Sequence, residues 1–401
     1  MDSARRPPEV DLTRADTFLY TDPLDFWETV RHHTPVYWHE ATSEAPGFWV
    51  VSRYADVQAC YANSAALSSE RGTVLDVLLR GDDSAGGRML AVTDGARHRA
   101  LRSVLLKAFS PRVLDAVTLQ VKQRVQGLVE PLVGAGPVDF ATAVADVVPI
   151  STICDLLSIP AADRPDLLRW NKLALSSEDP PESENEATQA RNQIVGYFVE
   201  LAEERQDHPG DDVVSMIASS TVDGEPLSVI DIALNCYSLI LGGDESSRVS
   251  AIGTVVALSS FPNQWELVRS GAVDPNAVVE EVLRWVTPAM HFARTAVKDL
   301  DIGGQAVRKG EIVSMWNTSA NFDETVFDDP RAFQAGRHPN KHLSLGYGQH
   351  FCLGAHLGRA ELRSLIEVLA SSVRRIEIVE PPRPIYSNFL AGYSSAVATF
   401  S

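Results

Sequence analysis

The stretch HLSLGYGQHFCLGAHLGRAELR, residues 342–363, decides the fold of this chain. Within it, Gly346 and Gly348 precede Cys352, and Gly354 follows it. Glycines let a backbone turn sharply and come close to a flat group, and the N-terminus of a helix favours the thiolate form of a nearby cysteine. The stretch therefore predicts a sulfur ligand directed at a metal.

The positions of the other cysteines limit which metal this is. Cys60, Cys154 and Cys236 lie far away in sequence, so the spacings of zinc sites, of redox C-x-x-C pairs and of C-x-x-C-H haem attachment are absent. A lone thiolate from a glycine-rich loop is typical of non-covalent haem with an axial cysteine. The alternative is an ordinary buried cysteine in a glycine turn.

The full string around Cys352 decides between these two interpretations. Residues 345–354, LGYGQHFCLG, resemble the F-G-x-G-x-H-x-C-x-G haem-binding signature of the bacterial cytochrome P-450 haem-thiolate monooxygenases. The family usually has Phe where this chain has Leu345, which changes how the sulfur is shielded but does not remove the ligand. The resemblance extends over nearly the whole chain and implies haem b with Cys352 as the axial ligand of iron.

Composition bounds the class of protein. Of the 401 residues, 45% are hydrophobic and 22% are charged, which is typical of globular proteins, and no linker divides the chain. We expect a single domain, 1–401, and a monomer. The first residues lack the apolar core of a signal peptide, and no run approaches the ~18 uncharged residues of a membrane span. With four scattered cysteines, this predicts a cytoplasmic protein without a membrane segment.

The charge balance bounds the partners. The chain has 35 basic and 53 acidic residues, and a net charge of −18 opposes nucleic-acid binding. Basic clusters are usually solvated faces. In the resembled family, however, the two basic segments border the proximal side of the haem, which implies docking of an acidic ferredoxin that carries electrons from NAD(P)H through a ferredoxin reductase. The basic residues are Arg97, Arg99, Arg102, Lys107 and Arg112, and Arg359, Arg363, Arg374 and Arg375.

Short elements are expected in the first hundred residues. A partly flexible leader (1–20) precedes a helix (23–33), a β-hairpin (35–39 with 48–52) and a second helix (54–63). Residues 69–93 show little periodicity and are predicted to be a long loop. In the resembled family this loop covers the substrate.

The next helix, residues 94–110, carries a candidate cofactor site. Asp94 is the expected N-cap, and His98 and Arg102 lie four residues apart on one face. Such a pair is more often on a surface than in a site. The pair matches the family's H-x-x-x-R, whose side chains bind a haem propionate through charge-assisted hydrogen bonds. By the same resemblance, Arg294 and His350 bind propionate as well.

Helical periodicity continues through 113–133, 141–159, 164–175 and 186–203. The connection SSEDPPESE, residues 176–184, is rich in proline and acids and is expected to be exposed and flexible. In the resembled family the corresponding helices form the lid through which substrates enter. We therefore expect 160–205 to be mobile lid helices.

A mostly apolar run, residues 227–260, predicts a helix of roughly 50 Å that crosses the core. Its interior holds GGDESS, although glycines disfavour helices and buried acids need partners. The string resembles the family's A/G-G-x-D/E-T signature, which makes Glu245 and Ser246 the acid and the alcohol that relay protons. Ser246 keeps the hydroxyl of the usual Thr but loses the methyl that restricts its rotamers. The alternative is a glycine kink with an ordinary acid.

Two further motifs follow. Glu281 and Arg284, in the helix predicted at 275–286, match the family's structural E-x-x-R, with Arg337 as the expected third partner. After Pro288 a strand is expected, and residues 301–321 are predicted to form a β-hairpin, followed by a helix at 355–371 and a turn at 387–393. By resemblance, the substrate pocket is lined by Ser238, Leu241, Gly242, Met290, Phe292 and Leu390, although alternation at Met290 and Phe292 would equally fit a buried strand.

Taken together, these patterns predict a mainly α fold of the cytochrome P-450 type, with a long central helix and small β-sheets. The implied reaction inserts one oxygen atom of O2 into an organic substrate by hydroxylation or epoxidation. The substrate is expected to be a bacterial secondary metabolite such as a polyketide or peptide, possibly carrier-protein-bound, with a sterol or fatty acid less favoured. Oxidative coupling, peroxide-driven turnover and a non-catalytic haem-thiolate sensor remain as alternatives.

Overall fold

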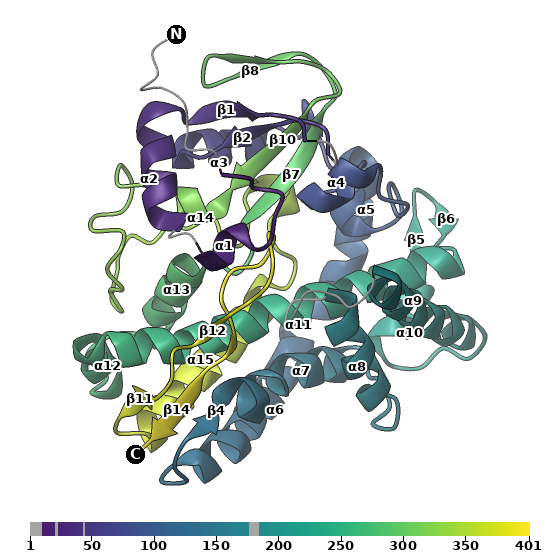
Figure 1. The fold of residues 1–401 in the computed structure, drawn as a ribbon. Helices are drawn as coiled ribbons and strands as arrows, with labels where there is room; N and C mark the ends of the chain where they lie inside the picture. The colour runs from purple at the N-terminus through teal and green to yellow at the C-terminus, as the bar shows by residue number, and fades with distance from the viewer. Residues whose placement is uncertain (1–9, 21–22, 43–44, 176–183) are drawn as a thin grey trace.

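The apolar run predicted as the central helix is α11 (Val229–Ser260), which crosses the middle of the molecule in Figure 1. Its 32 residues span about 48 Å at 1.5 Å per residue. The side chain of Ser228 accepts a hydrogen bond of 3.2 Å from the Asp231 amide and caps the first turn. The computed structural model of the chain describes residues 10–20, 23–42, 45–175 and 184–401.

Helices surround α11 and supply most of the core. The largest cluster of buried apolar side chains runs from α5 through α11 to α15, and α15 packs against α6 and α13. The helices are α1 (Thr17–Tyr20), α2 (Pro23–His33), α3 (Tyr54–Ala62), α4 (Leu75–Arg80), α5 (Gly95–Leu106), α6 (Pro111–Val129), α7 (Val148–Leu156), α8 (Arg164–Leu175), α9 (Glu184–Asp207), α10 (Val213–Ala218), α12 (Pro262–Arg269), α13 (Pro275–Val286), α14 (Asn317–Ala320) and α15 (Ala355–Ser372).

Small sheets complete the fold, and the largest lies at the end of the molecule opposite α6 and α15 (Figure 1). Its order is β1-β2-β10-β7-β3, with β2 and β10 parallel and the other pairs antiparallel. Its strands are β1 (Val36–His39), β2 (Phe48–Val51), β3 (Leu67–Ser68), β7 (His291–Ala296) and β10 (Ile312–Trp316). The smaller sheets contain β4 (Val138–Asp139), β11 (Ile376–Ile378) and β14 (Val397–Phe400), and the pairs β5 (Thr221–Val222) with β6 (Glu225–Pro226), β8 (Leu300–Ile302) with β9 (Gln305–Val307), and β12 (Arg383–Pro384) with β13 (Tyr393–Ser395).

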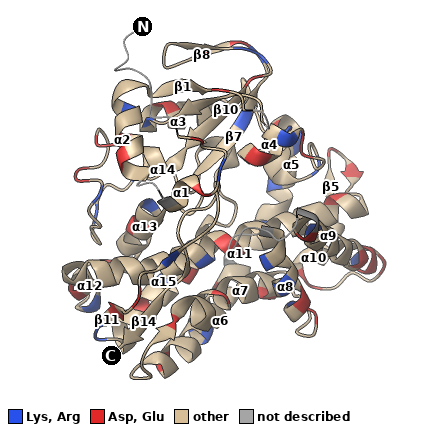
Figure 2. Ribbon diagram, in the orientation of Figure 1, with Lys and Arg blue, Asp and Glu red and all other residues tan. Residues whose placement is uncertain are grey.

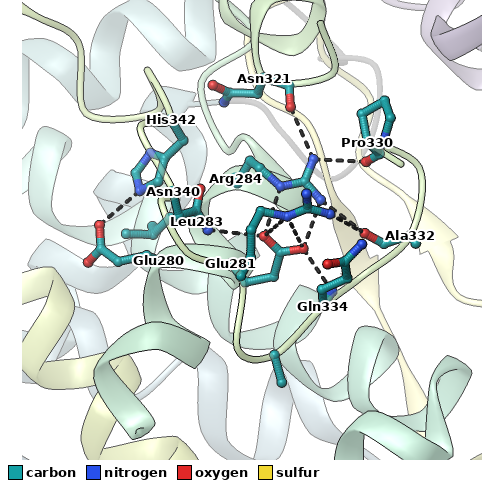
Figure 3. Close-up of polar contacts among 12 residues, drawn as sticks. Glu280, Glu281, Leu283, Arg284, Asn321, Pro330, Ala332, Gln334, Asn340 and His342 are labelled. Atoms are coloured by element: carbon teal, nitrogen blue, oxygen red, sulfur yellow. Dashed lines mark hydrogen bonds and ion pairs between the residues drawn. The ribbon is translucent and has the colours of Figure 1, made fainter. Parts of the chain in front are cut away.

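The E-x-x-R pair ties α13 to the segment before the cysteine loop. Glu281 and Arg284 are both fully buried, and Arg284 donates to both carboxylate oxygens of Glu281 at 2.8 Å (Figure 3). Arg337 also donates to Glu281, at 3.0 Å, as the sequence predicts. The remaining guanidinium hydrogens bind backbone carbonyls of residues 321–332. The motif is therefore a buried structural network rather than a surface ion pair.

Several predicted elements differ in the structure. Residues 69–93 are not an unbroken loop, because α4 and a 3-10 turn at Leu90–Val92 form within them. Residues 301–321 contain a hairpin only at β8 and β9. β10 instead joins β7 and β2, because its five residues are all buried and pair on both edges. The predicted flexible connection falls almost wholly at 176–183, outside the described residues, as do residues 1–9 of the expected leader. Within 10–20, Leu12 is fully buried.

Candidate active site

One large cavity of about 380 Å³ lies against α11. Its walls come from α5, α11, β7, the loop before α15 and the C-terminal turn, so residues from position 61 to position 390 meet there. The predicted site residues that line it are His98, Arg102, Ser238, Leu241, Gly242, Glu245, Ser246, Phe292, Arg294, His350, Cys352 and Leu390. The structure thus brings together every predicted site residue except Met290.

Cys352 lies in the loop just before α15, with its amide donating to the Leu345 carbonyl at 2.9 Å. The side chain is exposed to the cavity rather than buried in side-chain packing. Desolvation raises the pKa of the Cys352 thiol. The backbone N–H of Gly354 and the positive charges of Arg102 and Arg359 act to lower this pKa but do not outweigh desolvation. A bound metal would ionise this thiol.

The glycines before Cys352 have the backbone conformations that the sequence predicts. Gly346 and Gly348 have φ of 69° and 73°, in the left-handed region that disfavours other residues. A side-chain carbon at Gly348 would lie 3.0 Å from the Tyr61 carbonyl oxygen, so this loop also packs closely on α3. Gly354, in contrast, has ordinary φ and lines the cavity, where an added carbon would meet no atom within 4 Å.

Two histidines contact each other beside the cysteine loop, with their rings tilted by 45°. The rings of His98 and His350 lie 4.3 Å apart, and His350 Nε2 lies 2.9 Å from Asp94 Oδ1. Burial acts to raise the pKa of Asp94, but hydrogen bonds from His350, Ser68 and the Ser69 amide outweigh it and lower the pKa to about 2. Asp94 thus stands at the N-cap position of α5 without capping it, because its side chain orients His350 instead.

The donors around the cavity fit a haem. Both ring nitrogens of His98 are buried without a hydrogen-bond partner in the described part of the chain, although buried polar groups normally have one. Arg294 is buried at the same cavity, and Arg102 binds the Phe351 carbonyl with one nitrogen at 2.7 Å. Desolvation lowers the pKa of both guanidinium groups. A carboxylate of the haem would satisfy these donors, and Cys352 would supply the iron ligand.

The central stretch of α11 places an acid and an alcohol on the cavity wall. Glu245 is buried and paired with Arg248 at 3.0 Å, and Ser246 Oγ donates to the Gly242 carbonyl at 3.3 Å. The helix is continuous through this stretch. The neighbouring Asp244 turns away from the cavity and bonds the side-chain amide of Asn171 in α8. Burial, and then Glu245, raise the pKa of Asp244 to about 8.

The remaining wall of the cavity is mainly apolar. Phe292 packs edge-on against Phe389, with ring centroids 5.6 Å apart, and both line the cavity together with Leu390. Met290 was predicted here, but it lies in a separate cluster with Trp27 and Trp316. The strand alternation begins only at His291, and the isolated bridge between Ala289 and Leu390 puts Ala289 on the cavity side.

Sequence reasoning missed several polar residues of this cavity. Asn235 accepts from the Leu90 amide and donates to the Arg88 carbonyl, both at 3.0 Å, so it holds the 69–93 segment against α11. Glu361 in α15 is buried, and burial raises its pKa to about 7. Hydrogen bonds with Ser247 and Thr152 act to lower this pKa but only partly offset the effect of burial. For Asn235 the sequence signal was a polar residue within an apolar helical run, whereas Glu361 lies among other charged residues of α15 and nothing in the sequence distinguishes it.

Comparison with known proteins agrees with this geometry. The profile of the family described as Cytochrome P450 matches residues 275–377. Cytochrome P450 NovI of Streptomyces niveus is 43% identical over 92% of this chain and 91% of its own length. The chain belongs to the cytochrome P450 family. Linalool 8-monooxygenase of Pseudomonas putida is 30% identical over 95% of this chain and 96% of that protein.

Solved P450 structures share the whole fold. P450 OxyD, described as involved in the biosynthesis of vancomycin-type antibiotics, superimposes with a TM-score of 0.89 and 33% identity, covering 98% of this chain and 99% of that one. The chain is therefore a P450 monooxygenase, whose family works with haem-thiolate iron and O2 and receives electrons from redox partners. No helix within the described ranges combines the length and apolarity of a membrane span.

Proposed function

We propose that this P450 hydroxylates or epoxidises an organic small molecule during the tailoring of a bacterial secondary metabolite, a polyketide or a peptide. The observation that carries the proposal is a single cavity that joins Cys352, the acid and alcohol of α11, and an apolar wall with Phe292. The likeness to OxyD, whose description names antibiotic biosynthesis, supports the substrate class. Other relatives act as steroid C26-monooxygenases at 29% identity, which keeps sterols as the second candidate.

Each residue of the site has a role in this proposal. Cys352 holds the iron, and His98, Arg102, Arg294 and His350 bind propionates. The bound haem supplies the iron centre at which O2 is activated. The Ser246 hydroxyl donates a proton into the cavity, and Glu245 replaces it with a proton that it takes up from solvent. Leu241, Gly242, Ser238, Phe292 and Leu390 orient the substrate and exclude water.

The substrate class is tested by optical titration of the ferric holoprotein. A panel of free polyketide, peptide, amino-acid and sterol compounds is scored for the spin-state shift that substrate binding produces. The members that carry a carboxyl group are also tested as thioesters on a carrier protein. We expect a shift from the polyketide or peptide arm, free or carrier-bound. A shift from sterols alone would contradict the proposed class.

We propose that electrons arrive from NAD(P)H through a ferredoxin reductase and a ferredoxin. Lysines and arginines are spread over the ribbon, with acidic residues among them (Figure 2). Arg99 in α5 and Lys107 just after it are exposed, and Arg102 of the same helix contacts the cysteine loop through the Phe351 carbonyl. Arg359, in contrast, is paired with Glu280 at 2.6 Å. Lys107→Glu and Arg99→Glu should slow reduction by an acidic ferredoxin at low salt, with the effect shrinking as salt rises. If the protein turned over substrate with hydrogen peroxide but not with ferredoxin, reductase and NADPH, the result would instead support a peroxide-driven enzyme.

A further inference from the structure

Two segments from opposite ends of the sequence meet beside the cavity, at the turn formed by residues 387–391. The segment of residues 10–20 contacts this turn, and in Figure 1 it is the purple chain with α1 next to the yellow C-terminal chain. Phe389 and Leu390 of the turn line the cavity, whereas the described residues 10–19 do not. The turn thus separates the N-terminal segment from the cavity.

The side chain of Asn388 ties this turn to two other segments. Its Nδ2 donates to the Thr13 carbonyl at 2.8 Å and to Asp76 Oδ1, in the first turn of α4, at 2.7 Å. An amide group has two N–H hydrogens, so both are used, and the bond to the carboxylate is charge-assisted. Asn388 is only 7% exposed, so water does not readily replace these partners. The position of Asn388 is therefore set from outside the turn.

The turn is attached to the rest of the molecule from two sides. Backbone hydrogen bonds of 2.8 and 3.0 Å join residues 389 and 391 to residues 290 and 288, just before β7. Within the turn, Ser387 Oγ accepts from the amides of Phe389 and Leu390 at 3.0 and 2.9 Å. These bonds hold the turn from the side of β7, and Asn388 holds it from the side of α4 and the N-terminal segment.

The N-terminal segment is itself fixed well enough to act as an anchor. Leu12 is fully buried, in an apolar cluster with side chains of α2, α4 and β10. Its amide also donates to His39 Nε2, next to β2, at 3.2 Å. The bond from Asn388 to Thr13 therefore reaches a segment that is packed on the core.

We propose that Asn388 is a positioning residue that couples the N-terminal segment to the cavity wall, so that residues 10–20 help to determine which ligands the cavity accepts. Phe389 of the turn forms an edge-on pair with Phe292, with ring centroids 5.6 Å apart. This geometry contributes to the wall only while both backbones stay in place. Without the two Asn388 bonds, Phe389 would be held from one side only. The inference rests on the use of this cavity as the substrate site, as proposed above.

The first measurement is amide hydrogen exchange of the ferric holoprotein, read by mass spectrometry in peptides that cover residues 386–393. We expect exchange in this turn to be about tenfold faster in Asn388→Ala, because both ties on one side are lost. Peptides of α13 and α15 should exchange as in the parent protein. Asp76→Ala should show a smaller effect in the same direction, whereas Asp76→Asn keeps an acceptor oxygen and should stay close to the parent.

The second measurement is optical titration of the ferric holoprotein with imidazole and with 4-phenylimidazole, which both bind haem iron through nitrogen. Imidazole needs little space beyond the iron, whereas the phenyl group has to pack on the apolar wall. In Asn388→Ala we expect the dissociation constant of 4-phenylimidazole to rise about fivefold and that of imidazole by less than about twofold.

Leu12→Ala tests the N-terminal segment itself. This substitution removes the buried contact that fixes the segment, so it should change the turn and the two dissociation constants in the same direction as Asn388→Ala. The double variant should bind 4-phenylimidazole little more weakly than either single variant, because both substitutions break the same coupling.

Tyr54 provides a matched control. It is also 7% exposed, its hydroxyl donates to the Lys341 carbonyl at 2.7 Å, and it does not line the cavity. Tyr54→Phe should lower the melting temperature without changing exchange in the turn or the ratio of the two dissociation constants. If Asn388→Ala does not fold, Asp76→Ala carries both measurements, because it removes one acceptor and leaves Asn388 in place.

The outcomes separate this inference from the proposed function. Parent-like exchange of the turn in both Asn388→Ala and Asp76→Ala would overturn the inference. Faster exchange with an unchanged ratio of dissociation constants would also overturn it, because the turn would then not govern ligand choice. In both cases the parent protein still binds imidazole. If imidazole did not bind the parent protein, the haem site itself would be contradicted, and the inference with it.

Discussion

Ser246 is the residue at which the proposed relay departs from the family's usual threonine. Its hydroxyl donates to the Gly242 carbonyl at 3.3 Å, and no methyl group restricts its rotation. Ser246→Ala should therefore divert electrons from product to hydrogen peroxide, whereas Ser246→Thr should keep or improve the yield of product per NADPH. The measurement is product and peroxide formed per NADPH with the compound identified by titration. Unchanged yields in Ser246→Ala would show that this hydroxyl does not carry the proton.

His291 makes stability depend on pH. Its ring is 1% exposed and packs edge-on against Trp316, at 4.5 Å between centroids, and burial lowers its pKa to about 3. The unfolded chain therefore takes up a proton below about pH 6.5 that the folded chain does not, so stability falls as pH drops from 6.5 toward 3.

Replacing this ring removes that dependence. When the pH drops from 7 to 5, the free energy of unfolding of His291→Phe should fall by about 2 kcal/mol less than that of the parent protein. Guanidinium unfolding of the ferric holoprotein at the two pH values measures this, and the exposed His33→Phe serves as the control. Parallel losses in parent and His291→Phe would contradict the assignment.

At the scale of elements, two Glu-Arg pairs of equal spacing have opposite environments. Glu281 and Arg284 in α13 are fully buried, whereas Glu266 and Arg269 in α12 are 61% and 36% exposed. Glu281→Gln leaves two buried arginines without their carboxylate and should destabilise the protein by about 3–5 kcal/mol. Glu266→Gln should cost at most about 1 kcal/mol. Chemical unfolding of both variants measures the difference, and equal effects would contradict the structural role of the buried pair.

The elements themselves could largely be predicted where periodicity is strong. The helix predicted at 275–286 has the bounds of α13, and the one predicted at 227–260 differs from α11 by two residues. β10 was mistaken for one arm of a hairpin, because its partners β7 and β2 are set by buried contacts and not by a turn. Helix α4 was missed because its six residues are too few to show a period.

Across the whole molecule, the residues of the cavity were more predictable than their contacts. Twelve of the predicted site residues meet at one cavity although they span positions 98 to 390. The ion pairs of Asp146 with Lys172 and with Arg248 could not be predicted, because nothing in the sequence brings α8, α11 and the segment before α7 together at these side chains. Met290 was misplaced for a related reason, since only the bridge between Ala289 and Leu390 shows where the strand alternation starts.

The central claim is that the thiolate of Cys352 holds haem iron in this cavity. The most direct test is the absorption spectrum of the purified, reduced holoprotein under carbon monoxide. We expect the strongly red-shifted Soret band of thiolate ligation, and its loss in Cys352→Ser. An unshifted band in the parent protein, or a shifted band that persists in Cys352→Ser, would contradict the assignment.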